Sequence, residues 1–254
     1  MKENLLVKEQ FNKQADNFNE WSITRDEKIL QSLYDFWDIQ KNDRLLDVAC
    51  GTGAFAVYAG QRTRAVQGVD ISENMINIAI HNAKRQQLKN VSFLCSDVEK
   101  LPFESKSFES VISKAAFHHM KNYRRVFREM VRCCKQQGRI CLHDVVKYGE
   151  KTPDDFFEEL ERQIDISHQV SLSKQQIIDL YHENNIKVLR LFESTPELDF
   201  TDYLHHAVQT ANAAEKIGQL VKTGSQNREI AAWLATRNNT LFWKRKILTI
   251  VGQK

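Results

Sequence analysis

Apolar runs of five to eight residues recur along the first 146 residues, and amphipathic segments separate them. Five such runs predict β-strands, at 44–49, 65–70, 91–95, 107–113 and 139–146. Segments 54–60, 72–87 and 122–135 predict helices, and we expect Gly138 to end the last of them. Because strands that alternate with helices at this spacing need crossover connections, the pattern predicts an α/β fold with helices on both faces of one sheet.

The pattern changes after the fifth predicted strand. An acidic amphipathic segment predicts a helix over Pro153–Ile166. Ser173 and Gln176 resemble a capping box that opens another helix. Lys187–Glu193 then predicts a sixth strand.

The C-terminal quarter of the chain predicts two more helices and a strand. The helices are expected within 201–237, with a stop at Gly224, and Leu241–Val251 predicts the last strand. Nine glycines and three prolines leave little material for a turn-dense all-β fold, so we expect helices to dominate the connections.

Composition narrows the class of protein. The chain has 254 residues, 42% of them hydrophobic, and 36 basic against 33 acidic side chains, so it can fill one large core. Charges flank the short apolar run at Leu5–Val7, and no apolar run approaches the ~20 residues that cross a bilayer, so no signal peptide or membrane span is predicted. The five cysteines have neither CxxC nor zinc-site spacing, which predicts reduced thiols, a cytoplasmic location and no metal site.

A glycine turn between strand-end carboxylates is the first sign of chemistry. Asp47 ends one predicted strand, Gly51-Thr52-Gly53 follows it, and Asp70 ends the next strand. Glycines let the backbone approach a ligand closely, and a carboxylate about 20 residues later can accept both hydroxyls of a ribose. The spacing therefore indicates a nucleoside cofactor, although the turn alone also fits a GxGxxA dinucleotide fingerprint.

Four segments in order extend this constellation. They are Asp47–Gly53, Gly68–Met75, Ser96–Phe103, and Phe108–His119 with the following strand at Gly138–Asp144. In this order they resemble class I S-adenosylmethionine-dependent methyltransferases, in the small-molecule subgroup akin to ubiquinone and menaquinone C-methyltransferases. The resemblance implies one Rossmann-like domain with seven strands, the last antiparallel. Its parts would be an N-terminal helical lid (1–40), a cofactor-binding core (41–146) and substrate-cover helices with the final strands (147–254).

The resemblance implies where the methionine part of S-adenosylmethionine would lie. Asp47 would order the turn and lie near the methionine ammonium, while Gly51 and Gly53 pass beneath the cofactor. Lys114, after the fourth strand, would lie near the methionine portion. Ala49 stands where the family usually has glycine, so the turn is expected to be more crowded here.

The resemblance also implies a nucleoside site. Asp70 would hold the ribose hydroxyls, Ile71 and Met75 would flank the adenine, and Asp97 with the amide of Val98 would contact the adenine edge. Each has an ordinary structural alternative. A strand-end aspartate often caps the next helix, and Met75 at helical spacing is also typical of a core residue.

Histidines near the expected carboxyl-end rim are candidate general bases. His118 and His119 follow the fourth strand and are our catalytic candidates; a base helps methylation of a hydroxyl, phenol or carbon acid. Such histidines also commonly bond to backbone. His143 on the fifth strand is a second candidate, and His205 with His206 is weaker.

Aromatic residues suggest where a small acceptor would bind. Phe11, Phe18 and Trp21, with Ala15, mark an N-terminal helix that, by resemblance, would close over the cofactor. Five others lie in the predicted cover helices and either line an apolar cavity or pack in the core: Phe156, Phe157, Tyr181, Tyr203 and Trp233. We therefore expect a small apolar or aromatic substrate.

Other functions stay open at this point. Residues 203–254 hold eight basic against two acidic side chains, which is compatible with an anionic or RNA acceptor. The overall charge of +3 and the Ser113–Ala116 sequence, which lacks the Asn/Asp-Pro-Pro-Tyr/Phe-type motif, argue against nucleic acid. The rivals are a nicotinamide-dependent oxidoreductase and a non-catalytic protein that keeps the cofactor pocket. The oligomeric state is not predicted.

Overall fold

The computed structural model describes residues 2–207 and 211–254. Its strands are β1 (Arg44–Val48), β2 (Ala65–Asp70), β3 (Val91–Cys95), β4 (Phe108–Lys114), β5 (Cys134–Val145), β6 (Lys187–Ser194), β7 (Glu197–Asp199), β8 (Leu234–Arg237), β9 (Thr240–Lys244) and β10 (Ile247–Gln253). Its helices are α1 (Lys2–Glu20), α2 (Glu27–Phe36), α3 (Ala54–Gly60), α4 (Glu73–Arg85), α5 (Tyr123–Cys133), α6 (Lys151–Ile164), α7 (Lys174–Glu183), α8 (Phe200–His205), α9 (Ala211–Gly224) and α10 (Arg228–Ala231). Two short 3-10 helices are η1 (Ser22–Arg25) and η2 (Phe117–His119).

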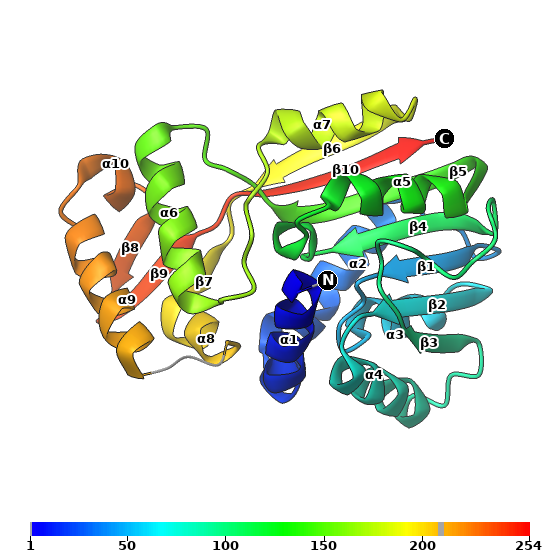
Figure 1. Ribbon diagram of the computed structural model, residues 1–254, viewed down its shortest axis with the longest axis horizontal. Helices are drawn as coiled ribbons and strands as arrows, with labels where there is room; N and C mark the ends of the chain where they lie inside the picture. Colours follow the sequence, from blue (N-terminus) through cyan, green and yellow to red (C-terminus); the bar gives the residue numbers. More distant parts are fainter. Residues whose placement is uncertain (1, 208–210) are drawn as a thin grey trace.

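A seven-stranded sheet in the order β3-β2-β1-β4-β5-β10-β6 forms the larger lobe (Figure 1). The first five strands pair in parallel, and β10 runs antiparallel between β5 and β6. Helices cover both faces of this sheet. The sheet confirms the predicted α/β fold with seven strands and an antiparallel last strand.

A second, three-stranded sheet in the order β7-β9-β8 lies in a smaller lobe with α6, α8, α9 and α10 (Figure 1). Its core is built around Trp243, whose ring stacks on Phe157 with centroids 5.2 Å apart. Leu160, Tyr203 and Ile230 are buried in the same cluster. The apolar side of α6 thus packs within this lobe.

Two sequence predictions about the later elements are wrong. The expected strand Leu241–Val251 is two strands, β9 and β10, which belong to different sheets and are separated by Arg245 and Lys246. The chain breaks here because Arg245 turns into a buried ion pair with Glu161 of α6. The segment 201–237, expected as two helices, contains most of α8, then α9, α10 and β8, and α9 ends at Gly224 as predicted.

Gly138 does not end a helix. Helix α5 ends earlier, at Cys133, and Gly138 lies inside β5. A Cβ at this position would lie 2.7 Å from the backbone oxygen of Glu109, where the β4–β5 pairing shifts register. The glycine therefore allows two strands to approach closely.

Local sequence signals explain how the helices near the sheet edge begin. The hydroxyl of Ser72 caps α4 by accepting a hydrogen bond from the Met75 amide at 3.1 Å. Ser173 and Gln176 form the predicted capping box at the start of α7. These caps fix where each helix starts relative to the strand before it.

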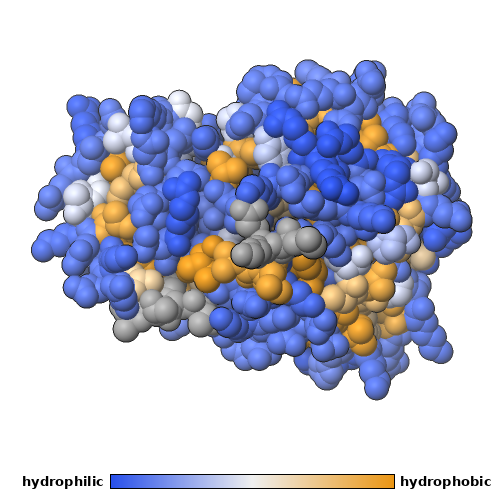
Figure 2. Space-filling model, viewed as in Figure 1, coloured by the Kyte–Doolittle hydropathy of each residue, from blue (hydrophilic) through white to orange (hydrophobic). Residues whose placement is uncertain are grey.

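Helix α1 crosses the space between the two lobes, where the carboxyl ends of the parallel strands point toward it (Figure 1). It is tied to α4 by polar contacts, among them Lys8 with Glu73 at 2.8 Å and Ser72 with Asn12 at 2.7 Å. Figure 2 shows mostly hydrophilic surface, with apolar surface gathered near the N-terminal part of α1, where Leu5 is exposed. Among the described residues, no helix combines the length and apolar character that crossing a bilayer requires.

Candidate functional site

A cavity of about 360 Å³ opens at the carboxyl ends of β1, β2 and β4, beneath α1. Ten of the twelve predicted site residues line it: Asp47, Ala49, Gly51, Asp70, Ile71, Met75, Asp97, Val98, Lys114 and His119. Gly53 and His118 do not. The topology therefore brings the predicted residues together at the edge where ligands of doubly wound sheets bind.

The turn between β1 and α3 has left-handed backbone at three positions. Ala49, Gly51 and Gly53 have φ angles of 57°, 53° and 74°. A Cβ on Gly51 would meet nothing within 4 Å, so this glycine borders open space. A Cβ on Gly53 would lie 2.8 Å from the Phe93 ring, so Gly53 allows α3 to pack against the sheet.

Asp70 links the glycine turn to the start of α4. Its Oδ2 accepts a hydrogen bond from the Gly51 amide at 2.9 Å, and its Oδ1 accepts one from the Ser72 amide at 2.9 Å. Burial raises the pKa of Asp70, and these backbone donors oppose the increase. The cap of α4 is Ser72 and not Asp70, whose carboxylate instead joins the glycine turn to Ser72 and lines the cavity.

Asp97 and Val98 lie on the loop after β3, under the first turn of α1. Asp97 Oδ2 accepts a hydrogen bond from Asn4 Nδ2 at 3.0 Å, and Oδ1 accepts one from the Glu99 amide at 2.9 Å. Asp70 and Asp97 therefore border the same cavity from the ends of neighbouring strands.

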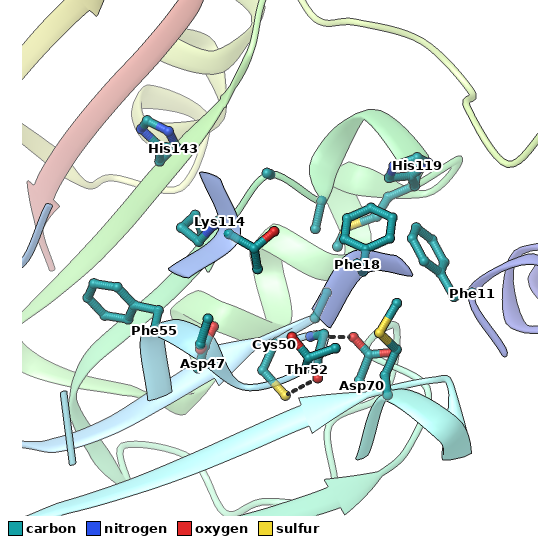
Figure 3. A pocket seen from close by; sticks show the side chains of 18 of the residues that line it. Phe11, Phe18, Asp47, Cys50, Thr52, Phe55, Asp70, Lys114, His119 and His143 are labelled. Atoms are coloured by element: carbon teal, nitrogen blue, oxygen red, sulfur yellow. Dashed lines mark hydrogen bonds between the residues drawn. The ribbon is translucent and has the colours of Figure 1, made fainter. Parts of the chain in front are cut away.

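Asp47, which is buried, and the half-buried Lys114 and His143 form an electrostatic group in the cavity wall, and Lys114 lies between the other two (Figure 3). Burial raises the pKa of Asp47 to about 7, although Lys114 opposes this. Burial also lowers the pKa of the Lys114 ammonium. Burial, followed by Lys114, lowers the pKa of His143 to about 4, and His143 Nδ1 lies 2.8 Å from Thr249 Oγ1.

The two adjacent histidines have different environments. His118 is buried, and its Nδ1 lies 2.6 Å from Asp144 Oδ1. The other oxygen of Asp144 accepts the amides of Ala116 and Phe117, so His118 belongs to a network that fixes η2. His119 lines the cavity.

His119 faces an aromatic wall contributed by α1. Its ring contacts the edge of Phe11 with centroids 4.9 Å apart, and Phe18 lies 5.8 Å from Phe11 (Figure 3). Burial, and then the neighbouring His118 and His168, lower the pKa of His119 well below its ordinary value. The imidazole is therefore neutral near pH 7.

The apolar part of the cavity differs from the one expected. Phe11, Phe18 and Trp21 line it as predicted, whereas Ala15 is buried outside it. The five aromatic residues expected from the cover helices lie outside this lining; Tyr181 is buried against Phe127 in the main core, and the others pack in the smaller lobe.

Several lining residues that the sequence did not predict come from η1 and from the segments around β7 and the β9–β10 break. They include Ile23, Pro196, Leu198, Arg245 and Ile247. Arg245 is buried and pairs with Glu161 and the hydroxyl of Tyr203. Only contacts across the fold bring these residues to the cavity, so no local pattern marks them. The three basic residues Lys244–Lys246 inside the apolar run 241–251 were the available signal.

The nucleoside half of the cavity has the features that a bound S-adenosylmethionine requires. Thr52 Oγ1 is buried in the cavity wall and has no hydrogen-bond partner. Open space borders Gly51. Burial disfavours the charged form of Asp47, so a nearby cation would stabilise that carboxylate. A ligand with a ribose and an ammonium group fits this donor and acceptor set.

Comparisons with known proteins identify the family. A model described as "Methyltransferase domain" matches residues 39–194. An uncharacterised methyltransferase of Bacillus subtilis, YcgJ, is 29% identical over 168 residues, which are 65% of this chain and 66% of that protein. A demethylmenaquinone methyltransferase of Bacillus cereus is 36% identical over 110 residues, covering 41% of this chain and 46% of the relative. The chain thus spans under two thirds of each relative.

Solved structures share the fold. The crystal structure of Bacillus subtilis YcgJ aligns with a TM-score of 0.83 at 22% identity, over 90% of this chain and 98% of that one. A Streptomyces coelicolor geranyl diphosphate C-methyltransferase, solved with S-adenosylhomocysteine, aligns with a TM-score of 0.61 at 15% identity, over 89% of this chain and 78% of that one. Because the family model covers more than half of the sequence, the chain belongs to the methyltransferase domain family, which confirms the predicted resemblance.

Proposed function

We propose that the protein transfers a methyl group from S-adenosylmethionine to a small apolar or aromatic acceptor. The observation that carries this is the single cavity wall that joins Asp47, Gly51, Asp70 and Asp97 to an aromatic face of α1. Family membership supports the reaction class. The same family membership argues against the rival oxidoreductase.

The residues at the strand ends would bind and orient the cofactor. Asp70 would accept the ribose hydroxyls, and Asp97 with the Val98 amide would contact the adenine edge. Ile71 and Met75 supply the apolar surface for the purine. S-adenosylmethionine supplies a methyl group on a sulfonium, which is a built-in leaving group.

Asp47 and Lys114 would bind the methionine end. Burial raises the pKa of Asp47 to about 7. A cationic amine beside this carboxylate would therefore stabilise its charged form. Lys114 would pair with the cofactor carboxylate. Each charge would then have a partner inside the cavity.

The acceptor would lie against the remaining apolar wall. Phe18, Trp21, Leu198 and Ile247 line this part, so an apolar or aromatic body fits there. The names of two similar proteins, a demethylmenaquinone and a geranyl diphosphate methyltransferase, support a small acceptor with an apolar body. Holding the acceptor in line with the methyl group contributes on the order of 7–11 kcal/mol.

His119 would act as the general base. His119 lines the cavity, whereas the neighbouring His118 forms a hydrogen bond with Asp144. We also propose that the whole chain works as one domain in the cytoplasm, with α1 as the lid of the cavity.

Methyl-labelled S-adenosylmethionine tests this function. The purified protein is incubated with panels of quinols, phenols, amines and thiols, and the labelled product is counted. Transfer to a quinol or phenol is expected, and His119→Gln lowers its rate by about 10²–10⁴-fold. Exposed His81 on α4 provides the control, since His81→Gln leaves the rate unchanged. No transfer to any acceptor would favour a non-catalytic binding protein.

A further inference from the structure

A chain of hydrogen bonds runs from the cavity to the linker between α6 and α7. His119 Nδ1 lies 3.0 Å from Ser167 Oγ, and Ser167 Oγ donates to Asp165 Oδ1 at 2.6 Å. Ser167 is fully buried, and Asp165 is 3% exposed. Water therefore does not compete strongly for these bonds.

The ionised form of Asp165 is held by three donors. Its Oδ1 accepts the Ser167 amide at 2.8 Å as well as the Ser167 hydroxyl, and its Oδ2 accepts Gln14 Nε2 at 3.1 Å. Burial raises the pKa of Asp165, and the bonds from Ser167 oppose this. Gln14 belongs to α1, so the position of this helix completes the set of donors.

The direction of these bonds fixes the tautomer of His119. A serine hydroxyl has one proton, and Ser167 gives it to Asp165. The Ser167 oxygen must then accept a proton from His119, so Nδ1 carries the hydrogen. Nε2 keeps its lone pair, and no described residue forms a hydrogen bond with it.

We propose that Ser167 and Asp165 are positioning residues that hold His119 with Nδ1 protonated and Nε2 free to act as the base toward the acceptor. This rests on the proposed function. In the step, the acceptor's O–H bond breaks and its proton passes to Nε2. The oxygen forms a bond to the methyl carbon, and the carbon–sulfur bond of the sulfonium breaks to leave neutral S-adenosylhomocysteine.

The same contacts stabilise the histidine after it accepts the proton. The imidazolium then donates through Nδ1 to Ser167, whose oxygen is polarised by the Asp165 carboxylate. The other titratable groups around His119 are His118, paired with Asp144, and His168, paired with Glu158 at 3.2 Å. Both histidines lower the pKa of His119, as does His206 less strongly.

Nitrogen-15 NMR of histidine-labelled full-length protein tests the proposal without an acceptor. Spectra are recorded with S-adenosylhomocysteine, and the signals of His119 are identified by their loss in His119→Gln. The expected result is a protonated Nδ1 and an unprotonated Nε2. Ser167→Ala is expected to mix the two tautomers, and Ser167→Thr, which keeps the hydroxyl, is expected to restore the original one.

Ser173→Ala is the matched control. It removes the half-buried capping hydroxyl at the start of α7, which accepts a hydrogen bond from the Gln176 amide, so it lowers stability without changing the tautomer. A wild-type spectrum with Nε2 protonated overturns the proposal even if the Ser167 variants do not fold. An unchanged spectrum in Ser167→Ala also overturns it.

Kinetics with a phenol from the acceptor panel add a second readout. Ser167→Ala is expected to lower kcat about ten- to a hundredfold, with the KM for S-adenosylmethionine unchanged. The acid limb of its pH profile is expected to move to lower pH, because the imidazolium has lost an acceptor. An unmoved limb would indicate a merely structural serine. If S-adenosylhomocysteine fails to bind while the expected tautomer is seen, the proposed function fails and only the tautomer assignment of His119 stands.

Discussion

Ala49 adopts a left-handed backbone conformation, with φ of 57°, directly before the glycine turn. For a residue with a Cβ this conformation costs roughly 1–2 kcal/mol. The resemblance places glycine at this position in most relatives, so the crowding expected from the sequence takes the form of backbone strain. The strain lies in the cavity wall, where the turn must pass beneath a ligand.

Replacing this residue should stabilise the protein. Ala49→Gly is expected to raise the free energy of unfolding by about 1 kcal/mol, since relief of strain outweighs the added freedom of the unfolded chain. Urea unfolding followed by circular dichroism measures the change.

Gly53→Ala should instead destabilise the protein. It combines left-handed backbone with a Cβ 2.8 Å from the Phe93 ring, so it should lower stability by about 2–4 kcal/mol. Equal effects of Ala49→Gly and Gly53→Ala would show that backbone strain at the turn is not the controlling quantity.

At the scale of elements, the sequence predicts structure that depends on neighbouring residues, but it does not predict structure that depends on contacts between distant residues. The capping box at Ser173 and the turn at Gly51 lie within a few residues of their partners, so the sequence alone predicts them. The break between β9 and β10 depends on Arg245 meeting Glu161, 84 residues away. Apolar and basic residues run through 241–251 without a breaker, so one strand was the local prediction.

The candidate site was likewise predicted where local sequence marks its residues and missed where only distant contacts do. Ten of its predicted residues follow strand ends in one parallel sheet, and the topology gathers them. Whether an aromatic residue lines a cavity or fills a core depends on packing, because both have helical spacing. The sequence therefore left both positions open for Tyr181, which packs in the core, and Ser167, which has no motif around it, was missed.

The Arg245–Glu161 pair should be essential to the smaller lobe. Both side chains are under 10% exposed, so Arg245→Met leaves an uncompensated buried carboxylate and is expected to cost about 3–5 kcal/mol. Urea unfolding measures this. The double variant Arg245→Met with Glu161→Gln should recover much of the loss. A single variant as stable as wild type would mean that Glu161 finds another partner or water.

At the scale of the whole molecule, buried neutral histidines make stability depend on pH. The pKa of His143, in the larger lobe, and of His206, beside Trp21, is lowered by burial from the ordinary 6.5 to about 4. Between these values the unfolded chain binds more protons than the folded one. Stability is therefore expected to fall as pH decreases from about 6.5 to about 4, by up to about 3 kcal/mol for each histidine.

A second loss is expected at lower pH. Glu158, paired with His168, has its pKa lowered to about 2, so the stability it contributes above 4.5 is lost as pH falls toward 2. Urea midpoints measured between pH 7 and pH 4 test the first window. His143→Gln should flatten the slope there, and an unchanged slope would show that His143 takes up its proton in the folded state.

The lobes and α1 enclose one cavity, and the central claim is that its nucleoside half binds S-adenosylmethionine. Calorimetric titration with S-adenosylhomocysteine, and with NAD in parallel, tests this most directly. We expect one site for S-adenosylhomocysteine and no heat with NAD. Asp70→Asn should weaken binding by about 1–3 kcal/mol, whereas Asp26→Asn, in the cap of α2 outside the cavity, should not. Binding of NAD alone, or wild-type affinity in Asp70→Asn, would contradict the account.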